Sequence, residues 1–308
     1  MPFGVNSGGD VSKERPGSPD PMSEQVAPRD VERIRAALSR HGHGFQFAVI
    51  NELLRLAVDR RIDWQVEAVE FPFEVNGQPG HADILLRNEY AVAVVECKKV
   101  RTGLSTWGFA RSNLVSRSDF GAQTVALEGV QRLNPDPKLN ACLRPGRTTE
   151  RQYNVFVEMK DGEGESSGTS RGALDNAVTQ ALRSSSGILR QLISHPSLLS
   201  GSRGAALTIV PIIVTNAKLL TCNTDLALTD LASGQLPEKL VVEVRDWLWL
   251  RTMASAGVRH EFWHAGGHAS ASFGDLQDQR YARSIAVTTC AGLADCLLGV
   301  STHCSSTE

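Results

Sequence analysis

The apolar and polar positions of this 308-residue chain follow two periods, one typical of helices and one typical of strands. Apolar residues that recur every three or four positions predict helices over residues 30–40, 45–61, 173–194 and 291–300. Apolar runs and alternating stretches predict strands over residues 64–75, 82–86, 91–95, 153–160, 206–214 and 281–289. This mixed order of helices and strands predicts an α/β fold.

Local signals refine these elements. The pair Asn76-Gly77 predicts a tight turn after the first strand, and Pro211 predicts an irregularity or an edge in strand 206–214. The segment 41–44, which reads His-Gly-His-Gly, is expected to separate the first two helices. Three acidic residues of the first strand are expected to face solvent, namely Glu67, Glu70 and Glu74.

The apolar run 91–95 ends abruptly in Glu96, Cys97 and Lys98. A run that is apolar on both faces predicts a central strand covered on both sides. Charged groups at the end of such a strand cost free energy unless they have a partner or a ligand. The strand-like run 82–86 precedes it, and the four residues between the two are turn-like, with Asn88 able to adopt a positive φ.

The expected hairpin brings two acidic residues together. If Asn88 and Glu89 are the two turn residues, Asp83 lies opposite Val94. Asp83 is then the diagonal neighbour of Glu96, at roughly 7–8 Å between backbones.

Side-chain alternation places Lys98 on the same face as Glu96 and points Cys97 to the opposite face. Two carboxylates this close repel each other unless a metal ion or a proton intervenes. Carboxylate ligands suit Mg²⁺, Mn²⁺ or Ca²⁺, so the hairpin predicts a cation site.

This part of the chain resembles the PD-(D/E)xK nuclease superfamily, whose pattern is an Asp, then a second hairpin strand and then Glu-x-Lys. Asp83, Glu96 and Lys98 lie at the signature positions. The Pro that often precedes the Asp is Ala82 in this chain. The resemblance covers about residues 45–215 and implies a restriction-endonuclease-like core. That core has three layers around a mixed central sheet, in the order helix, three strands, helix and strand.

The resemblance also implies a function. It implies a DNA nuclease that uses Mg²⁺, or Mn²⁺ in its place, held by Asp83, Glu96 and the backbone carbonyl of Cys97, with Lys98 as a catalytic residue. In the resolvase-like branch a Glu on the first helix assists, and Glu52 is the matching residue. A Gln on the later helix assists in other members, and Gln180 matches it.

The chain is expected to contain a disordered tail (1–29), the nuclease-like core (30–220) and a C-terminal extension packed on that core (221–308). Residues 100–152 form an insertion with eight Arg or Lys against four Asp or Glu, and Trp107 and Phe109 lie among its polar residues. This surplus predicts phosphate contacts through Arg144, Arg147 and Arg151, although a solvated charged surface is the alternative.

Composition restricts the picture further. The net charge of −2 gives no overall nucleic-acid signal, so any basic surface is local. Six scattered cysteines without a Cys-x-x-Cys pair indicate reduced thiols and a cytoplasmic protein. No apolar run approaches the ~20 residues of a membrane span, and the N-terminus lacks the apolar core of a signal peptide. A homodimer is compatible with the sequence.

Other interpretations remain open. The nuclease-like domain can have lost turnover and serve as a DNA or protein interaction module. The segment 260–264 satisfies the H-E-x-x-H pattern of zinc hydrolases through His260 and His264, but neighbouring glycines disfavour the required helix. A second Glu-x-Lys, at Glu158 and Lys160, is expected on a neighbouring strand of the same sheet.

Overall fold

The structure is a computed structural model that describes residues 28–40, 42–100, 106–111, 122–128, 140–145, 152–159, 172–195, 206–222, 230, 232–236, 240–253 and 282–305. Its helices are α1 (Pro28–Arg40), α2 (His43–Val58), α3 (Ala173–Ser194) and α6 (Leu293–Ser305). Gly42, with φ 84°, separates α1 from α2, as its sequence context predicts. In the described part of the chain, no helix is both long and apolar enough to cross a membrane.

The described strands form two sheets. The main sheet contains nine strands: β1 (Gln65–Val75), β2 (Gln78–Arg87), β3 (Ala91–Lys98), β5 (Gln123–Glu128), β6 (Asn140–Pro145), β7 (Gln152–Tyr153), β9 (Ala206–Thr215), β12 (Trp247–Met253) and β13 (Ala282–Thr289). The second sheet contains β4 (Thr106–Ala110), β8 (Val155–Met159), β10 (Lys218–Cys222) and β11 (Val242–Arg245).

The main sheet is mixed, with the order β1-β2-β3-β9-β13-β12-β7, and β5 pairs with β9 while β6 pairs with β5. The first three strands are antiparallel, whereas β3, β9 and β13 run parallel. Both β12 and β13, from the segment 221–308, are strands of this sheet. The prediction of an α/β fold with a mixed sheet is therefore confirmed.

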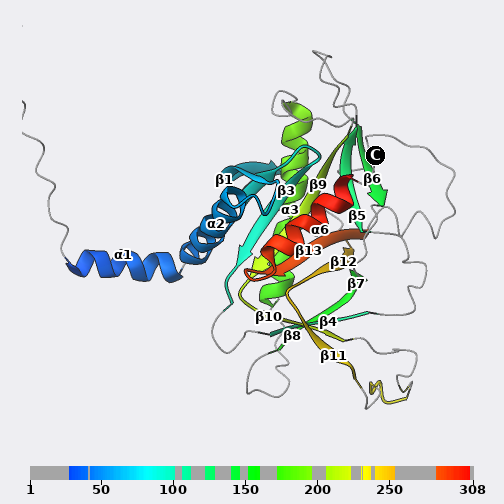
Figure 1. The fold of residues 1–308 in the computed structure, drawn as a ribbon. Coiled ribbons are helices and arrows are strands. Elements are labelled where there is room, and N and C mark those ends of the chain that lie inside the picture. The colour runs from blue at the N-terminus through cyan, green and yellow to red at the C-terminus, as the bar shows by residue number, and fades with distance from the viewer. Residues whose placement is uncertain are drawn as a thin grey trace, which may run out of the picture.

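Helices cover the main sheet on both faces (Figure 1). On one face α2 and α6 pack through Leu53 and Leu297 against side chains such as Ile84 and Val95. On the other face α3 packs through Ile188 against Val94 and its neighbours. Because β3 is covered on both sides, every residue from its start to Glu96 is buried, as its continuous apolar run predicts.

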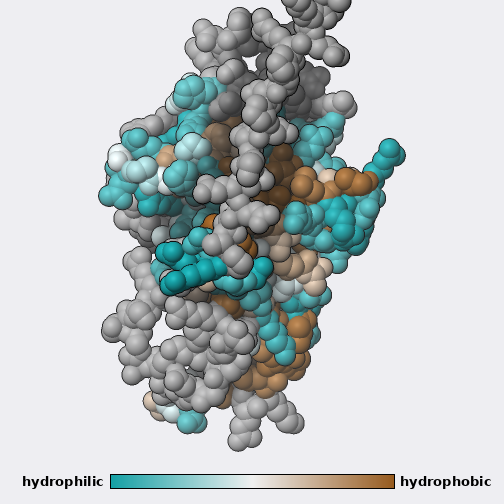
Figure 2. Space-filling model, turned by 90° about the vertical axis from the view of Figure 1, so that its left-hand side faces the viewer, coloured by the Kyte–Doolittle hydropathy of each residue, from teal (hydrophilic) through white to brown (hydrophobic). Residues whose placement is uncertain are grey.

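Residues 100–152, expected as an insertion, contain strands of both sheets. The segment contributes β4 to the second sheet and β5 and β6 to the main one. Trp107 and Phe109 are buried and pack with the N-terminal half of α3. They are therefore core residues, and the exposed, phosphate-binding role that their polar neighbours suggest is wrong for them. The outer side of the second sheet exposes Val157 and Val244, and apolar side chains gather at this lower end of the molecule (Figure 2).

The β2–β3 hairpin has a longer connection than the sequence suggests. Leu85, rather than Asp83, lies opposite Val94, so the register differs from the prediction by two residues. Asn88 does not have a positive φ. Its side-chain oxygen instead accepts hydrogen bonds from the backbone N–H groups of Tyr90 (3.0 Å) and Ala91 (2.8 Å), which closes the turn.

Pro211 marks a change of partner along β9. On one edge, residues up to Ile209 pair with β5, and residues from Ile212 onward pair with β13. Pro211 lies between the two partners, where the chain tolerates the loss of one backbone N–H. The irregularity predicted from this proline is therefore present.

The close packing of α3 on β1 depends on a residue without a side chain. A Cβ atom added at Gly187 would overlap the ring of Phe73, which is only 6 % exposed in the core beneath the helix. Gly44 in α2 is a matched contrast, since a Cβ atom there would meet nothing within 4 Å.

The substitution Gly187→Ala should therefore destabilise the protein by roughly 1–3 kcal/mol through overpacking. This reverses the usual gain of about 1 kcal/mol when Ala replaces Gly inside a helix. Chemical denaturation of both variants measures the effect, and Gly44→Ala should be neutral or stabilising. Equal stability of Gly187→Ala and the wild-type protein would contradict the packing described here.

Candidate functional site

Two carboxylates lie side by side where β2 and β3 separate at one end of the sheet. The last paired residues of the hairpin at this end are Ile84 and Val95, and one further step along each strand gives Asp83 and Glu96. Asp83 Oδ2 accepts a hydrogen bond from the backbone N–H of Cys97 at 2.7 Å. Asp83 is therefore directly beside Glu96 across the hairpin, closer than the diagonal position expected from the sequence.

The faces of β3 follow strict alternation. Val94 packs in the cluster under α3, and Lys98, four residues further along, also reaches α3, where its Nζ donates a hydrogen bond to Gln180 Oε1 at 3.3 Å. Cys97 packs on the opposite face, against the cluster of α2 and α6. Lys98 and Gln180, both named from the sequence, are thus brought together.

Burial and repulsion dominate the electrostatics of the pair. Glu96 is only 7 % exposed, and desolvation, followed by repulsion from Asp83, raises its pKa to about 8. Desolvation also raises the pKa of Asp83, against the opposing effect of its hydrogen bond from the Cys97 N–H. Lys98 lowers the pKa of both carboxyls, but its charge does not offset burial.

Lys98 forms no ion pair with Glu96 or Asp83, although it lies near both carboxylates. In the described part of the chain, Glu96 has neither a hydrogen bond nor an ion pair, although it is more than nine-tenths buried. Likewise, no ion pair within 4.0 Å joins Lys98 to Asp83 or Glu96. Among the residues that the structure describes, no cationic side chain therefore forms an ion pair with either acidic group.

Sequence reasoning missed three residues around this pair. Gln46 of α2 is buried, and its Nε2 donates to Glu70 Oε1 at 2.7 Å and to the backbone oxygen of Asp83 at 3.1 Å. His43 Nδ1 lies 3.3 Å from Gln46 Oε1. Glu70 is exposed as predicted, but its charge also acts on both Asp83 and Glu96.

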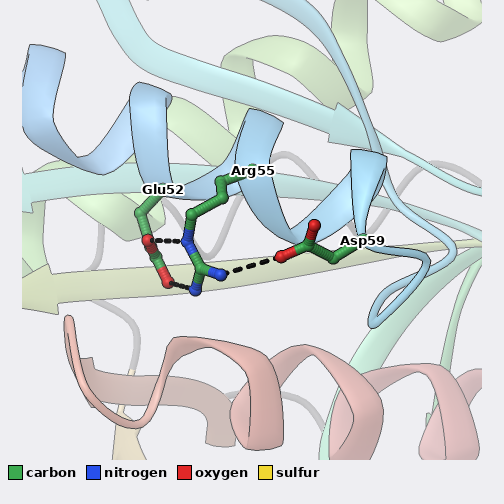
Figure 3. Close-up of polar contacts among 3 residues, drawn as sticks. All are labelled: Glu52, Arg55 and Asp59. Atoms are coloured by element: carbon green, nitrogen blue, oxygen red, sulfur yellow. Dashed lines mark hydrogen bonds and ion pairs between the residues drawn. The ribbon is translucent and has the colours of Figure 1, made fainter.

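The structure does not bring Glu52 to the site. Its carboxylate receives two hydrogen bonds from Arg55, at 2.6 and 2.8 Å, and Arg55 also bonds to Asp59 at 2.8 Å (Figure 3). Glu52 and Gln46 are six residues apart, which places them about 120° from each other around the helix axis. The residue of α2 that reaches the carboxylates is therefore Gln46.

The glutamate of the second Glu-x-Lys motif, Glu158, has a structural role. Glu158 lies on β8 in the second sheet, so its expected place in the main sheet is wrong. Its Oε2 accepts a hydrogen bond from the backbone N–H of Ala173 at 2.6 Å, which caps the start of α3.

For the remaining site residues predicted from the sequence, the structure describes either the backbone alone or nothing. Arg144 belongs to β6, where its backbone is opposite Thr124. Arg147 and Arg151 lie outside the described residues, and so does the His260–His264 segment.

The oxygen atoms present fit a divalent cation. The carboxylates of Asp83 and Glu96 and the backbone carbonyl of Cys97 form a hard donor set of the kind that Mg²⁺ and Mn²⁺ accept. Among the described residues, no three His, Cys, Asp or Glu side chains are already gathered as a complete ligand set. The fit depends on Glu96, a buried carboxylate that has no partner among the described residues.

Comparisons with protein-family models, with curated proteins and with solved structures find no match to this chain.

The raised pKa of Glu96 predicts how stability depends on pH. A carboxyl whose pKa is higher in the folded than in the unfolded protein binds more protons when folded. Stability therefore falls as pH rises from 4.5, the unperturbed value, to about 8. Thermal unfolding in EDTA should show Glu96→Gln to be more stable than the wild-type protein above this window, by at least about 2 °C.

The difference should vanish below the window, because glutamine resembles protonated Glu96 in both shape and charge. Glu74→Gln, at an exposed position of β1, is the matched control and should leave the pH profile unchanged. A Glu96→Gln profile parallel to that of the wild-type protein would show that Glu96 is not desolvated.

Proposed function

We propose that this protein is a metal-dependent DNA nuclease of the PD-(D/E)xK type, which hydrolyses phosphodiester bonds with Mg²⁺ or Mn²⁺. The observation that carries the proposal is buried Glu96 next to Asp83, without a partner in the described part of the chain. Lys98 is close by and forms an ion pair with neither carboxylate.

The arrangement of elements supports the proposal. Apart from the strands β4 to β8, which lie between β3 and α3, the chain order α2, β1, β2, β3, α3 and β9 is that of a restriction-endonuclease-like core: helix, three strands, helix and strand. The four strands are consecutive in the sheet, and β3 is parallel to β9. The acidic pair lies at the end of the β2–β3 hairpin, which is where the superfamily carries its signature residues.

Asp83, Glu96 and the carbonyl of Cys97 would hold the cation. The hydrogen bond from the Cys97 N–H fixes one oxygen of Asp83 and so orients the rest of that carboxylate. When bound, a divalent cation offsets the charge of a phosphate and lowers the pKa of a water molecule. The burial of Glu96 strengthens the attraction between its charge and the cation, because the local dielectric constant is low.

Lys98 acts on the charge that develops in the transition state. Gln180 accepts a hydrogen bond from its ammonium group and thereby holds it on the face of β3 that carries Glu96. Because Lys98 forms no ion pair with either carboxylate, its charge is available to orient water and to stabilise the phosphoryl oxygens. In a catalytically degenerate interaction module, this lysine would be expected to pair with the carboxylates instead.

The experiment is a cleavage assay on supercoiled, linear, branched and single-stranded DNA. The wild-type protein should cleave at least one of these substrates with Mg²⁺ and none with EDTA, and Asp83→Asn should abolish the cleavage. Binding without cleavage of any substrate by the wild-type protein would instead favour the interaction module.

Lys98→Met should separate catalysis from binding. The substitution keeps the length of the side chain and removes its charge, so it should lower the single-turnover rate by about 10²–10³-fold. DNA affinity measured with Ca²⁺ should change little, because the lost interaction is made mainly in the transition state.

Lys99→Met is the control, since Lys99 is the exposed neighbour of Lys98 in sequence and follows the end of β3. It should retain the wild-type cleavage rate. A wild-type rate for Lys98→Met would place the chemistry elsewhere in the chain.

A further inference from the structure

Gln46 is a buried residue whose amide nitrogen is directed at the acidic end of the sheet. Only 4 % of the residue is exposed, and it lies in the first turns of α2. Its Nε2 uses both hydrogens, one toward Glu70 Oε1 and one toward the Asp83 carbonyl, and its Oε1 faces His43. These contacts fix the amide and, through it, the orientation of the Glu70 carboxylate.

Glu70 has a backbone conformation that glutamate rarely adopts. Its φ is 51°, in the left-handed region, while its neighbours Val69 and Phe71 remain paired with Ile84 and Ala82 of β2. A residue other than glycine is strained in this region, and such a conformation persists only where the surrounding structure holds it. The same register places Glu70 level with Asp83, on the side away from Glu96.

Three adjacent strands therefore each carry one carboxylate at the same level: Glu70 on β1, Asp83 on β2 and Glu96 on β3. Glu96 is buried and has no hydrogen bond or ion pair among the described residues, which points independently to a ligand at this place.

We propose that Glu70 is a third acidic residue of the cation site and that Gln46 is its positioning residue. This inference rests on the proposed function, because it concerns the same divalent cation. In this chain the assisting group from α2 is an amide, and the additional negative charge comes from the neighbouring strand β1. Glu70 is exposed, so its carboxylate is accessible to a hydrated cation.

The test is the affinity of the full-length, EDTA-treated protein for Mn²⁺, measured by isothermal titration calorimetry without DNA. Glu70→Gln should weaken Mn²⁺ binding by about 10–100-fold, and Gln46→Met should weaken it by about 10-fold. Glu74→Gln, on the same strand but away from the hydrogen-bonded group, should bind Mn²⁺ like the wild-type protein.

The double variant separates positioning from a general effect on folding. If Gln46 acts through Glu70, the combination of both substitutions should bind Mn²⁺ no more weakly than Glu70→Gln alone. Additive losses would show that Gln46 does not act through Glu70, which would overturn its role as a positioning residue. Wild-type Mn²⁺ affinity in a folded Glu70→Gln variant would remove Glu70 from the site while leaving the proposed nuclease intact.

A wild-type protein that binds no Mn²⁺ would overturn both this inference and the proposed function. Because the wild-type titration comes first, the two failures are distinguishable.

Discussion

The desolvation of Glu96 beside Asp83 is the constraint on which the account of this protein depends. Removing a carboxylate from water costs several kcal/mol unless a partner offsets it. In the described structure neither a hydrogen bond nor an ion pair does so for Glu96, and a second carboxylate adds repulsion. The fold therefore keeps an unfavourable charge arrangement at one end of its sheet, which a proton or a divalent cation would relieve.

The rest of the fold holds this arrangement in place. The strand β3 lies between β2 and β9 in the sheet, with α2 and α6 over one face and α3 over the other, so Glu96 has little freedom to move into water. The same helices deliver polar groups to the site, because Gln46 comes from α2 and Gln180 from α3. Packing and site geometry are thus set by the same three layers.

Much of the site follows from strand periodicity. The hairpin register differs from the expected one by two residues, and a shift of two keeps every side chain on its predicted face. The family resemblance named Gln180 as an assisting residue, and the structure adds its hydrogen bond with Lys98. Glu70 was within reach of the sequence too, because the Asn76-Gly77 turn sets a register that brings Glu70 level with Asp83.

Other features could not be read from the sequence. The choice of Gln46 over Glu52 depends on how α2 is rotated against the sheet, which tertiary packing decides. Short strands such as β4 contain too few residues to show a clear alternation of apolar and polar positions. Trp107 therefore resembled an exposed aromatic residue, although its side chain belongs to the core.

The most direct test of the central claim is an anomalous difference map from crystals of the wild-type protein soaked in MnCl₂. The account predicts a manganese peak between the carboxylates of Asp83 and Glu96, and its loss in Asp83→Asn crystals soaked in the same way. A fully ordered acidic pair without a peak, or a peak elsewhere only, would contradict the claim.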